Sequence, residues 1–269
     1  MAADEAGGAC YKKVHIYSSF GVFRAIRQHL VQWGFMLLPV VILAGGRATR
    51  LRPLTEQIPK ALIDINGEPF VAHQLRLLRS RGIERVVFCI GYLGEMIRDF
   101  VGDGSRFGIS VAYSSDGPVL QGTGGAVRRA LHLLGDRFFV LYGDSYLPCA
   151  YDAVQRAFEG SAKKGLMTVH KNEGKWDNSN VELNAGEIVR YDKVRRSATM
   201  QHIDYGLGLF TREAFDSSEE NPLDLAWVYQ KLLSRNELAG YEVPDRFYEI
   251  GSPAGMEDLR SYLAAGGPR

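Results

Sequence analysis

The most constraining feature of the sequence is a regular alternation of short apolar runs and amphipathic stretches, beginning at residue 39. The apolar runs predict buried strands at residues 40–43, 85–90, 109–113 and 138–142. The stretches between them predict helices at residues 69–81, 95–101 and 125–134. Strands that alternate with helices in this way form βαβ units. We therefore predict a Rossmann-like α/β fold, with a mostly parallel central sheet flanked by helices.

The second half of the chain has a different pattern. Short strand candidates at residues 166–170, 180–183, 187–191 and 205–210 are joined by turn signals and predict small antiparallel additions. Helices are predicted at residues 222–233 and 253–263. We expect residues 37–265 to form one domain. Residues 1–36 are interpreted as an N-terminal extension, possibly not native, because Met36 directly precedes the first strand; a genuine leading helix is the alternative.

Charge and cysteine content exclude several classes of protein. The chain has 32 Lys and Arg against 31 Asp and Glu, so no overall field attracts nucleic acid or an anionic membrane. The longest apolar run near the N-terminus, residues 35–43, is too short to span a bilayer. Three cysteines without CxxC spacing argue against zinc and disulfides, so a cytoplasmic protein is the default. The sequence is compatible with a homo-oligomer.

A glycine pair, Gly45-Gly46, ends the first predicted strand. Glycine has no Cβ, so the backbone amides at this turn can approach an anion. The planar guanidinium group of Arg50 can donate two hydrogen bonds to phosphate oxygens, and Lys60 adds a compact ammonium group. The pattern is neither GxxxxGK[ST] nor GxGxxG, which argues against a P-loop or a dinucleotide site. We predict a phosphate-binding loop here; a plain tight turn with solvated arginines is the alternative.

Residues 43–69 read LAGGRATRLRPLTEQIPKALIDINGEP. They resemble the sugar-1-phosphate nucleotidylyltransferase family, whose members carry LAGGxGTRLxPLTxxxPKxLxxxxGxP after their first strand. One position departs, because Ala48 stands where the family has a third glycine. The resemblance implies that Arg50 acts on the NTP phosphates and that Lys60 bridges the sugar phosphate and the α-phosphate. It implies nucleotide contacts at Leu43, Ala44, Gly45, Gly46 and Arg47.

Two carboxylates are candidate metal ligands. Asp144 follows a buried strand, where a carboxylate can bind a hard cation together with phosphate oxygens, although a turn aspartate is the simpler alternative. The family has Gly-Asp here, and the resemblance implies that Asp144 holds Mg²⁺. A late segment around Glu249 resembles the family motif WxDxGTPE and implies a second metal ligand, with glutamate in place of aspartate. Asp245 is the candidate if the register slips.

Asp116 follows the third predicted strand, in a segment that resembles the family's nucleobase loop. Gly122 and Thr123 open the next helix and are expected to line the same base. A carboxylate can accept both N1–H and N2–H₂ of guanine, whereas uracil or thymine offers a single N3–H. Asp116 therefore favours guanine, although a turn aspartate that faces water is an equal alternative.

The sugar side is expected from the second half of the chain. Lys193 stands where the family has a lysine that contacts the sugar phosphate, although a solvated surface lysine is the alternative. Tyr205-Gly206 resembles the family's glycine position at which a sugar ring approaches a strand. Asn180 is a candidate for sugar hydroxyls, although loop asparagines often serve turns.

These expectations define an enzyme that condenses an NTP with a sugar 1-phosphate. The sugar phosphate oxygen attacks the α-phosphorus in line, pyrophosphate leaves, and no covalent protein nucleophile is needed. Residues 102–108 are similar to bacterial members that make GDP-heptose or UDP-N-acetylmuramate, so heptose 1-phosphate guanylyl transfer is the first interpretation. The alternatives are N-acetylmuramate 1-phosphate uridylyl transfer, and thymidylyl, uridylyl or cytidylyl transfer to glucose 1-phosphate. A weakly catalytic nucleotide-sugar sensor or subunit is the alternative class.

Overall fold

The computed structural model describes residues 36–117, 119–176, 178–216 and 222–267. Residues Leu37–Arg269 group together as one unit. The predicted N-terminal extension, residues 1–36, lies outside the described residues except for Met36. Its assignment as an extension therefore stays a prediction.

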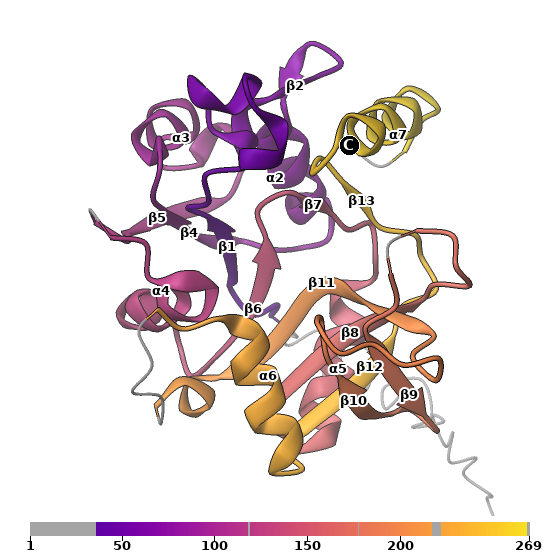
Figure 1. Cartoon of the computed structure of the whole chain (residues 1–269). Coiled ribbons are helices and arrows are strands. Elements are labelled where there is room, and N and C mark those ends of the chain that lie inside the picture. The colour runs from indigo at the N-terminus through magenta and orange to yellow at the C-terminus, as the bar shows by residue number, and fades with distance from the viewer. Residues whose placement is uncertain (1–35, 118, 177, 217–221, 268–269) are drawn as a thin grey trace, which may run out of the picture. The chain divides into compact units, whose positions relative to one another are not determined.

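A nine-stranded sheet forms the centre of the described part of the chain (Figure 1). Its strand order is β10-β9-β11-β6-β1-β4-β5, and off this path β8 pairs with both β11 and β12. Strands β6, β1, β4 and β5 run parallel to one another, which confirms the predicted parallel core. The strands are β1 (Val40–Ala44), β4 (Arg85–Ile90), β5 (Ser110–Ser115), β6 (Arg137–Tyr142), β8 (Gly165–Lys171), β9 (Val181–Asn184), β10 (Glu187–Tyr191), β11 (His202–Thr211) and β12 (Leu238–Glu242).

The second half adds the expected antiparallel strands. Strand β11 runs antiparallel to both β6 and β8, and β10 runs antiparallel to β9. Two short ladders lie outside the main sheet. The first joins β2 (Asp64–Ile65) to β3 (Glu68–Pro69). The second joins β7 (Ser145–Tyr146) to β13 (Tyr248–Glu249), and so brings a late segment beside the end of β6.

Helices cover both faces of the sheet. Val40 and Ile42 of β1 point into one hydrophobic core and Val41 points into another, as expected for a parallel strand buried on both sides. Helices α2, α3 and α5 pack into the first core, and α4 and α6 into the second. Helix α7 packs in a third cluster with α2 and β7. The helices are α2 (Phe70–Ser80), α3 (Gly94–Val101), α4 (Gly122–Ala130), α5 (Tyr151–Ser161), α6 (Leu225–Ser234) and α7 (Pro253–Ala264).

Helix α4 corrects one predicted boundary. It begins at Gly122 and ends at Ala130, earlier than the predicted residues 125–134, and a short 3-10 turn follows. The first turn is glycine-rich, which argues against a helix by propensity alone. Here the glycines let the helix approach Leu223 closely, since a Cβ on Gly122 would lie 2.4 Å from the Leu223 carbonyl oxygen. The amides of Gly124 and Gly125 both donate to that oxygen.

Two elements of the sheet and its helices were not predicted at all, α5 and β12. Helix α5 buries Tyr151, Val154 and Phe158, which have helical spacing.

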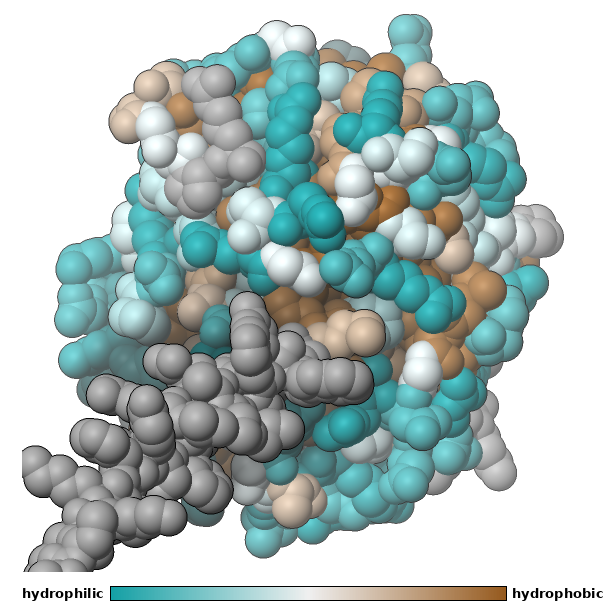
Figure 2. All heavy atoms as spheres, turned by 180° about the vertical axis from the view of Figure 1, so that it is seen from behind, coloured by the Kyte–Doolittle hydropathy of each residue, from teal (hydrophilic) through white to brown (hydrophobic). Residues whose placement is uncertain are grey.

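The face of the molecule shown in Figure 2 is largely hydrophilic, and apolar side chains show only in patches. Over the described residues, none of the helices is both long enough and apolar enough to cross a bilayer.

Candidate active site

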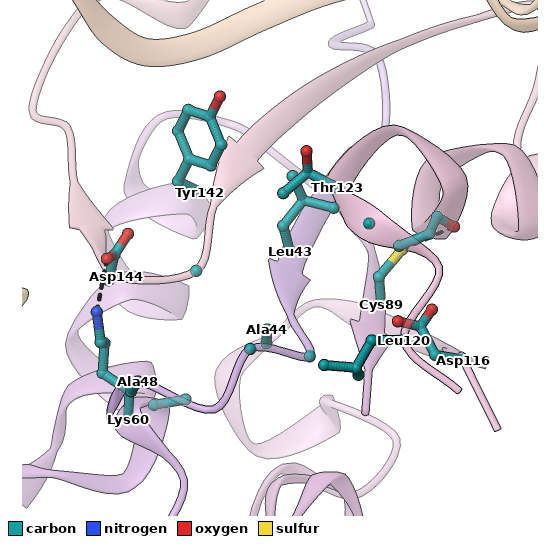
Figure 3. Close-up of a pocket in the computed structure, with 16 residues that line it drawn as sticks. Leu43, Ala44, Ala48, Lys60, Cys89, Asp116, Leu120, Thr123, Tyr142 and Asp144 are labelled. Atoms are coloured by element: carbon teal, nitrogen blue, oxygen red, sulfur yellow. Dashed lines mark hydrogen bonds and ion pairs between the residues drawn. The ribbon is translucent and has the colours of Figure 1, made fainter. Parts of the chain in front are cut away.

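A pocket of about 260 Å³ opens at the carboxyl ends of the parallel strands. It lies where ligands bind in open α/β sheets. Figure 3 shows Lys60 and Asp144 at one end, and Asp116, Cys89 and Leu120 at the other. The lining residues are Leu43, Ala44, Gly45, Gly46, Ala48, Lys60, Ala61, Cys89, Asp116, Leu120, Gly122, Thr123, Ala126, Tyr142, Gly143 and Asp144.

Backbone segments that follow β1, β4 and β6 approach one another closely beside the pocket. The amide of Gly143 donates to the Leu43 carbonyl, and a Cβ on Gly143 would lie 2.4 Å from that oxygen. The Gly45 carbonyl accepts from the amide of Tyr92, beyond the end of β4. Glycine is therefore required at Gly143 because β1 and β6 leave no room for a side chain.

Ala48 adopts a left-handed backbone conformation, with φ 47° and ψ 44°. The conformation is held by its own carbonyl, which accepts from the hydroxyl of Thr55 at 2.8 Å and from the amide of Leu51 at 3.0 Å. The family pattern has glycine at this position. The structure supplies the physical reason, since an L-residue in this region is strained.

Replacing Ala48 by glycine is expected to relieve this strain. We expect Ala48→Gly to raise the free energy of unfolding by up to about 1 kcal/mol, measured by denaturant titration. Ala48 also lines the pocket, so the same change is expected to lower the KM for NTP. Ala162→Gly is the control, because Ala162 has φ 53° at the end of α5, outside the pocket. We expect Ala162→Gly to raise the free energy of unfolding by a similar amount and to leave the KM for NTP unchanged. A lower free energy of unfolding for Ala48→Gly would contradict the proposed backbone strain.

Lys60 and Asp144 form an ion pair inside the pocket. The Lys60 Nζ donates to Asp144 Oδ2 at 2.8 Å, and the two side chains are 17% and 28% exposed. The partners come from distant parts of the chain, since Lys60 follows the β1 loop and Asp144 follows β6. The fold therefore brings two of the predicted site residues into direct contact.

The two arginines of the loop lie outside the pocket lining. Arg50 and Arg47 are both exposed, and neither contributes to the lining of the pocket. The Arg47 guanidinium lies 6.0 Å from the centroid of the Tyr92 ring. The structure thus brings Lys60, but not Arg50, into contact with Asp144, and the phosphate role of Arg50 stays a prediction.

The far end of the pocket holds a buried carboxylate. Asp116 is 6% exposed, and its Oδ2 accepts from the Gln121 amide at 3.4 Å. Burial raises the pKa of this carboxyl, against the opposing effect of that hydrogen bond. Cys89 lies in the same end, and its thiol donates to the Ala126 carbonyl at 3.4 Å. Burial, and then the charge of Asp116, raise the pKa of this thiol, so it stays neutral.

Thr123 and Gly122 line the pocket and also join two helices. The Thr123 hydroxyl lies 3.2 Å from Asp224, the N-cap of α6, and accepts from the Leu225 amide at 2.8 Å. These contacts account for Thr123 structurally, and the close approach to Leu223 accounts for Gly122, without a nucleotide. Their predicted nucleotide contacts remain predictions.

Of the predicted sugar-binding residues, Lys193 and Gly206 lie near Tyr142, which lines the pocket, whereas the side chain of Tyr205 does not. Lys193 Nζ is 3.5 Å from the hydroxyl of Tyr142, a pocket residue. Gly206 has φ +96° and faces Tyr142 and Ser145. Tyr205, however, is 1% exposed and packs in the first hydrophobic core. Its side chain therefore points away from the cleft, because neighbouring residues of a strand alternate between faces.

A model of the nucleotidyl transferase family matches residues 39–179, which is more than half of the chain. This range contains the glycine loop, the Lys60–Asp144 pair and Asp116. The chain belongs to the nucleotidyl transferase family. Its relatives include guanylyltransferases and uridylyltransferases of sugar 1-phosphates, and the chain spans less than two thirds of the length of several of them.

Individual relatives in this family differ in substrate. The chain is 28% identical over 223 residues to the Xenopus tropicalis mannose-1-phosphate guanylyltransferase catalytic subunit beta, covering 80% of this chain and 62% of that one. It is 28% identical over 242 residues to the Neisseria meningitidis N-acetylmuramate alpha-1-phosphate uridylyltransferase, covering 85% and 99%. A Bacillus anthracis structure described as a glucose-1-phosphate thymidylyltransferase, in complex with sucrose, superposes with a TM-score of 0.73 and 19% identity, covering 85% and 95%. That likeness concerns the fold alone.

Members of this family typically use a divalent metal ion. The described residues contain no cluster of three or more His, Cys, Asp or Glu side chains that would hold a metal without a substrate. Glu249 of β13 pairs with Ser145, and the Ile250 amide donates to the Asp144 carbonyl at 3.0 Å. The β7–β13 ladder therefore places Glu249, rather than Asp245, across from the Asp144 segment. The carboxylate of Asp144 in the pocket fits a hard cation that takes its other ligands from phosphates and water. Glu249 does not line the pocket, and its role as a second metal ligand stays a prediction.

One buried carboxylate of this nucleotidyl transferase was missed in the sequence. Asp204 in β11 lies 3.6 Å from Lys193 Nζ, and its side chain is only 4% exposed. The available signal was an acidic residue inside a strand that is mostly apolar. Such a residue is rarely fully buried unless it is paired.

Proposed function

We propose that this protein transfers the guanylyl group of GTP to a heptose 1-phosphate, giving GDP-heptose and pyrophosphate, with Mg²⁺ as cofactor. The observation that carries the choice of base is the buried carboxylate of Asp116 in the pocket. Its position at the opposite end from the Lys60–Asp144 pair suits a nucleotide that spans the pocket from base to phosphates (Figure 3).

Asp116 lies in a covered site, where hydrogen-bond donors on the base contribute to affinity. A buried carboxylate without a full set of donors is costly, so a ligand that supplies donors gains affinity. Guanine supplies N1–H and N2–H₂ on one edge, which match the two oxygens of Asp116. Uracil, thymine and cytosine present a carbonyl acceptor on that edge, which would face the carboxylate unfavourably.

The phosphate chemistry is assigned to the other end of the pocket. Asp144 and Glu249 would hold Mg²⁺, which neutralises triphosphate charge when it is bound. Lys60, next to Asp144, would place its ammonium between the α-phosphate and the incoming sugar phosphate. Lys193, beside Tyr142, would hold the sugar phosphate. These residues bring together two anions that repel each other, so catalysis here is positioning and charge stabilisation.

A substrate panel tests this proposal directly. GTP, UTP, dTTP and CTP are each mixed with the 1-phosphates of D-glycero-D-manno-heptose, N-acetylmuramate, glucose and mannose, and pyrophosphate release is followed with Mg²⁺. We expect GTP with heptose 1-phosphate to give the highest kcat/KM. A higher value with any other NTP would refute the guanylyl assignment, and a higher value with another sugar would refute the heptose assignment.

The alternative candidate is uridylyl transfer to N-acetylmuramate 1-phosphate. It is favoured by the match to the Neisseria meningitidis uridylyltransferase, of which this chain covers 99%. The guanylyltransferase subunit from Xenopus tropicalis matches at the same identity, but this chain spans only 62% of its length. Asp116 favours guanylyl transfer, because a carboxylate can accept two donors from guanine but only one from uracil.

Asp116→Asn is expected to remove the preference for guanine. We expect kcat/KM for GTP to fall about 10- to 100-fold, because a charged acceptor is lost, and that for UTP to fall less. Burial raises the pKa of Asp116, so the carboxyl takes up a proton at a higher pH than an ordinary aspartate. In the unaltered protein, the ratio of KM for GTP to KM for UTP should therefore rise as the pH falls through that raised pKa. The ratio in Asp116→Asn should not change with pH; a pH-dependent ratio there would contradict the assignment.

A further inference from the structure

Asp204 lies beneath Lys193 at the sugar end of the site. The Asp204 side chain is 4% exposed, whereas that of Lys193 is 43% exposed, and the Lys193 Nζ lies 3.6 Å from Asp204 Oδ2. Because the carboxylate is covered and the ammonium is not, a ligand that enters from solvent meets Lys193 first. A direct contact between Asp204 and a substrate is therefore not what this arrangement provides.

The Asp204 carboxylate is fixed by contacts from several segments. Its Oδ1 accepts from the Gly206 amide at 3.1 Å, and its Oδ2 accepts from the Tyr191 hydroxyl of β10 at 3.3 Å. The backbone amide of Asp204 donates to Asn180 Oδ1 at 3.0 Å. Asn180 thus serves the backbone of β11 in this structure. Together these contacts give the carboxylate a defined position from which it can orient a flexible lysine.

Two aromatic rings flank the lysine that Asp204 contacts. Lys193 Nζ lies 5.3 Å from the centroid of the Tyr142 ring and 5.8 Å from that of the Tyr191 ring. It also lies 3.5 Å from the Tyr142 hydroxyl. Rings of this kind attract an ammonium group through their faces but do not fix its direction. Asp204 is the negatively charged partner that supplies the direction.

We propose that Asp204 is a positioning residue that holds the Lys193 ammonium ready for the phosphate of the sugar 1-phosphate. This rests on the proposed function, in which Lys193 binds that phosphate. A lysine side chain loses much conformational freedom when it binds, and a pre-oriented lysine loses less. The carboxylate also has an opposing effect, because its negative charge weakens the electrostatic attraction between Lys193 and a phosphate. The two effects change the KM of the sugar phosphate in opposite directions, so an experiment can decide between them.

A double-mutant cycle on Asp204 and Lys193 is the test. Asp204→Asn keeps the shape of the side chain and removes its charge. We expect it to raise the KM for heptose 1-phosphate about 10-fold, with the KM for GTP changed less than about 2-fold. In a Lys193→Gln background, the same change should alter the KM for heptose 1-phosphate less than about 2-fold, because Asp204 acts through the lysine. Glu242→Gln is the control, since this half-exposed acid on β12 pairs with His202 instead.

Each other outcome overturns the proposal. An unchanged or lower KM for heptose 1-phosphate in Asp204→Asn would show that the field effect dominates. An equal rise in both backgrounds would show that Asp204 acts on the sugar independently of Lys193. Thermal unfolding of each variant separates these effects from misfolding. If Asp204→Asn does not fold, Tyr191→Phe removes one hydrogen bond from the same carboxylate, and a rise in KM that persists without Lys193 would again refute the role.

Failure of the proposed function gives a different result. If the unaltered protein releases no pyrophosphate with any pair of substrates, the proposed function is wrong. Calorimetric titration of the four proteins of the cycle with heptose 1-phosphate then measures the coupling between Asp204 and Lys193 without turnover. Coupled effects on the dissociation constant would support the positioning role, and additive effects or no binding would refute it.

Discussion

Lys60→Ala is expected to lower kcat by about 10²- to 10³-fold, because it removes one preorganised cationic contact from the transition state. The ammonium lies 2.8 Å from Asp144 and is the one lysine among the lining residues of the pocket. Fold stability should change little, since a partly exposed ion pair contributes about 1 kcal/mol or less. Steady-state pyrophosphate release measures the first effect, and denaturant unfolding measures the second.

The protein contains a matched control for this substitution. Lys164 forms an ion pair with Glu237 at the same distance, 2.8 Å, and neither residue lines the pocket. Lys164→Ala should therefore reproduce any general cost of losing such a pair while leaving kcat unchanged. If Lys60→Ala kept near-normal turnover, or if Lys164→Ala lost as much activity, Lys60 would not be the phosphate-binding lysine of this enzyme.

Much of the site follows from the sequence because topology alone brings its parts together. Strands β1 and β6 are predicted to be parallel, so the segments that follow them meet at one edge of the sheet. Lys60 and Asp144 lie on those segments, and their contact was therefore predictable although 84 positions separate them. Ala48 was likewise predictable as a departure from the family pattern, but its left-handed backbone was visible only in the structure.

The remaining features depend on packing between distant segments. Tyr205 was assigned to the cleft through its neighbour Gly206, yet adjacent strand residues point to opposite faces. The pairing of β11 with β8 also shifts register between Asp204 and Gly208, which no local pattern indicates. Asp116 is buried beside Cys89 of the neighbouring strand β4, so its turn sequence alone left exposure and burial equally open.

Asp144→Asn is expected to have an effect at least as large as that of Lys60→Ala, with a different signature. The amide keeps the shape of the side chain but removes the charge that would hold Mg²⁺. We expect kcat to fall by about 10²- to 10³-fold or more, corresponding to several kcal/mol of lost charge stabilisation. We also expect the Mg²⁺ concentration for half-maximal activity to rise, which Lys60→Ala should not cause. Titrating Mg²⁺ in both variants separates the two roles.

Glu237→Gln provides the control for this second prediction. Its side chain is 27% exposed, against 28% for Asp144, and each accepts an ion pair of 2.8 Å from a lysine. Each substitution therefore removes one lysine-paired negative charge of similar exposure, and of the two residues only Asp144 lines the pocket. Equal Mg²⁺ requirements in Asp144→Asn and in the unaltered protein would mean that Asp144 serves only as the counter-ion of Lys60. The metal would then have to be held elsewhere, and Glu249, across the β7–β13 ladder, would be the first residue to substitute.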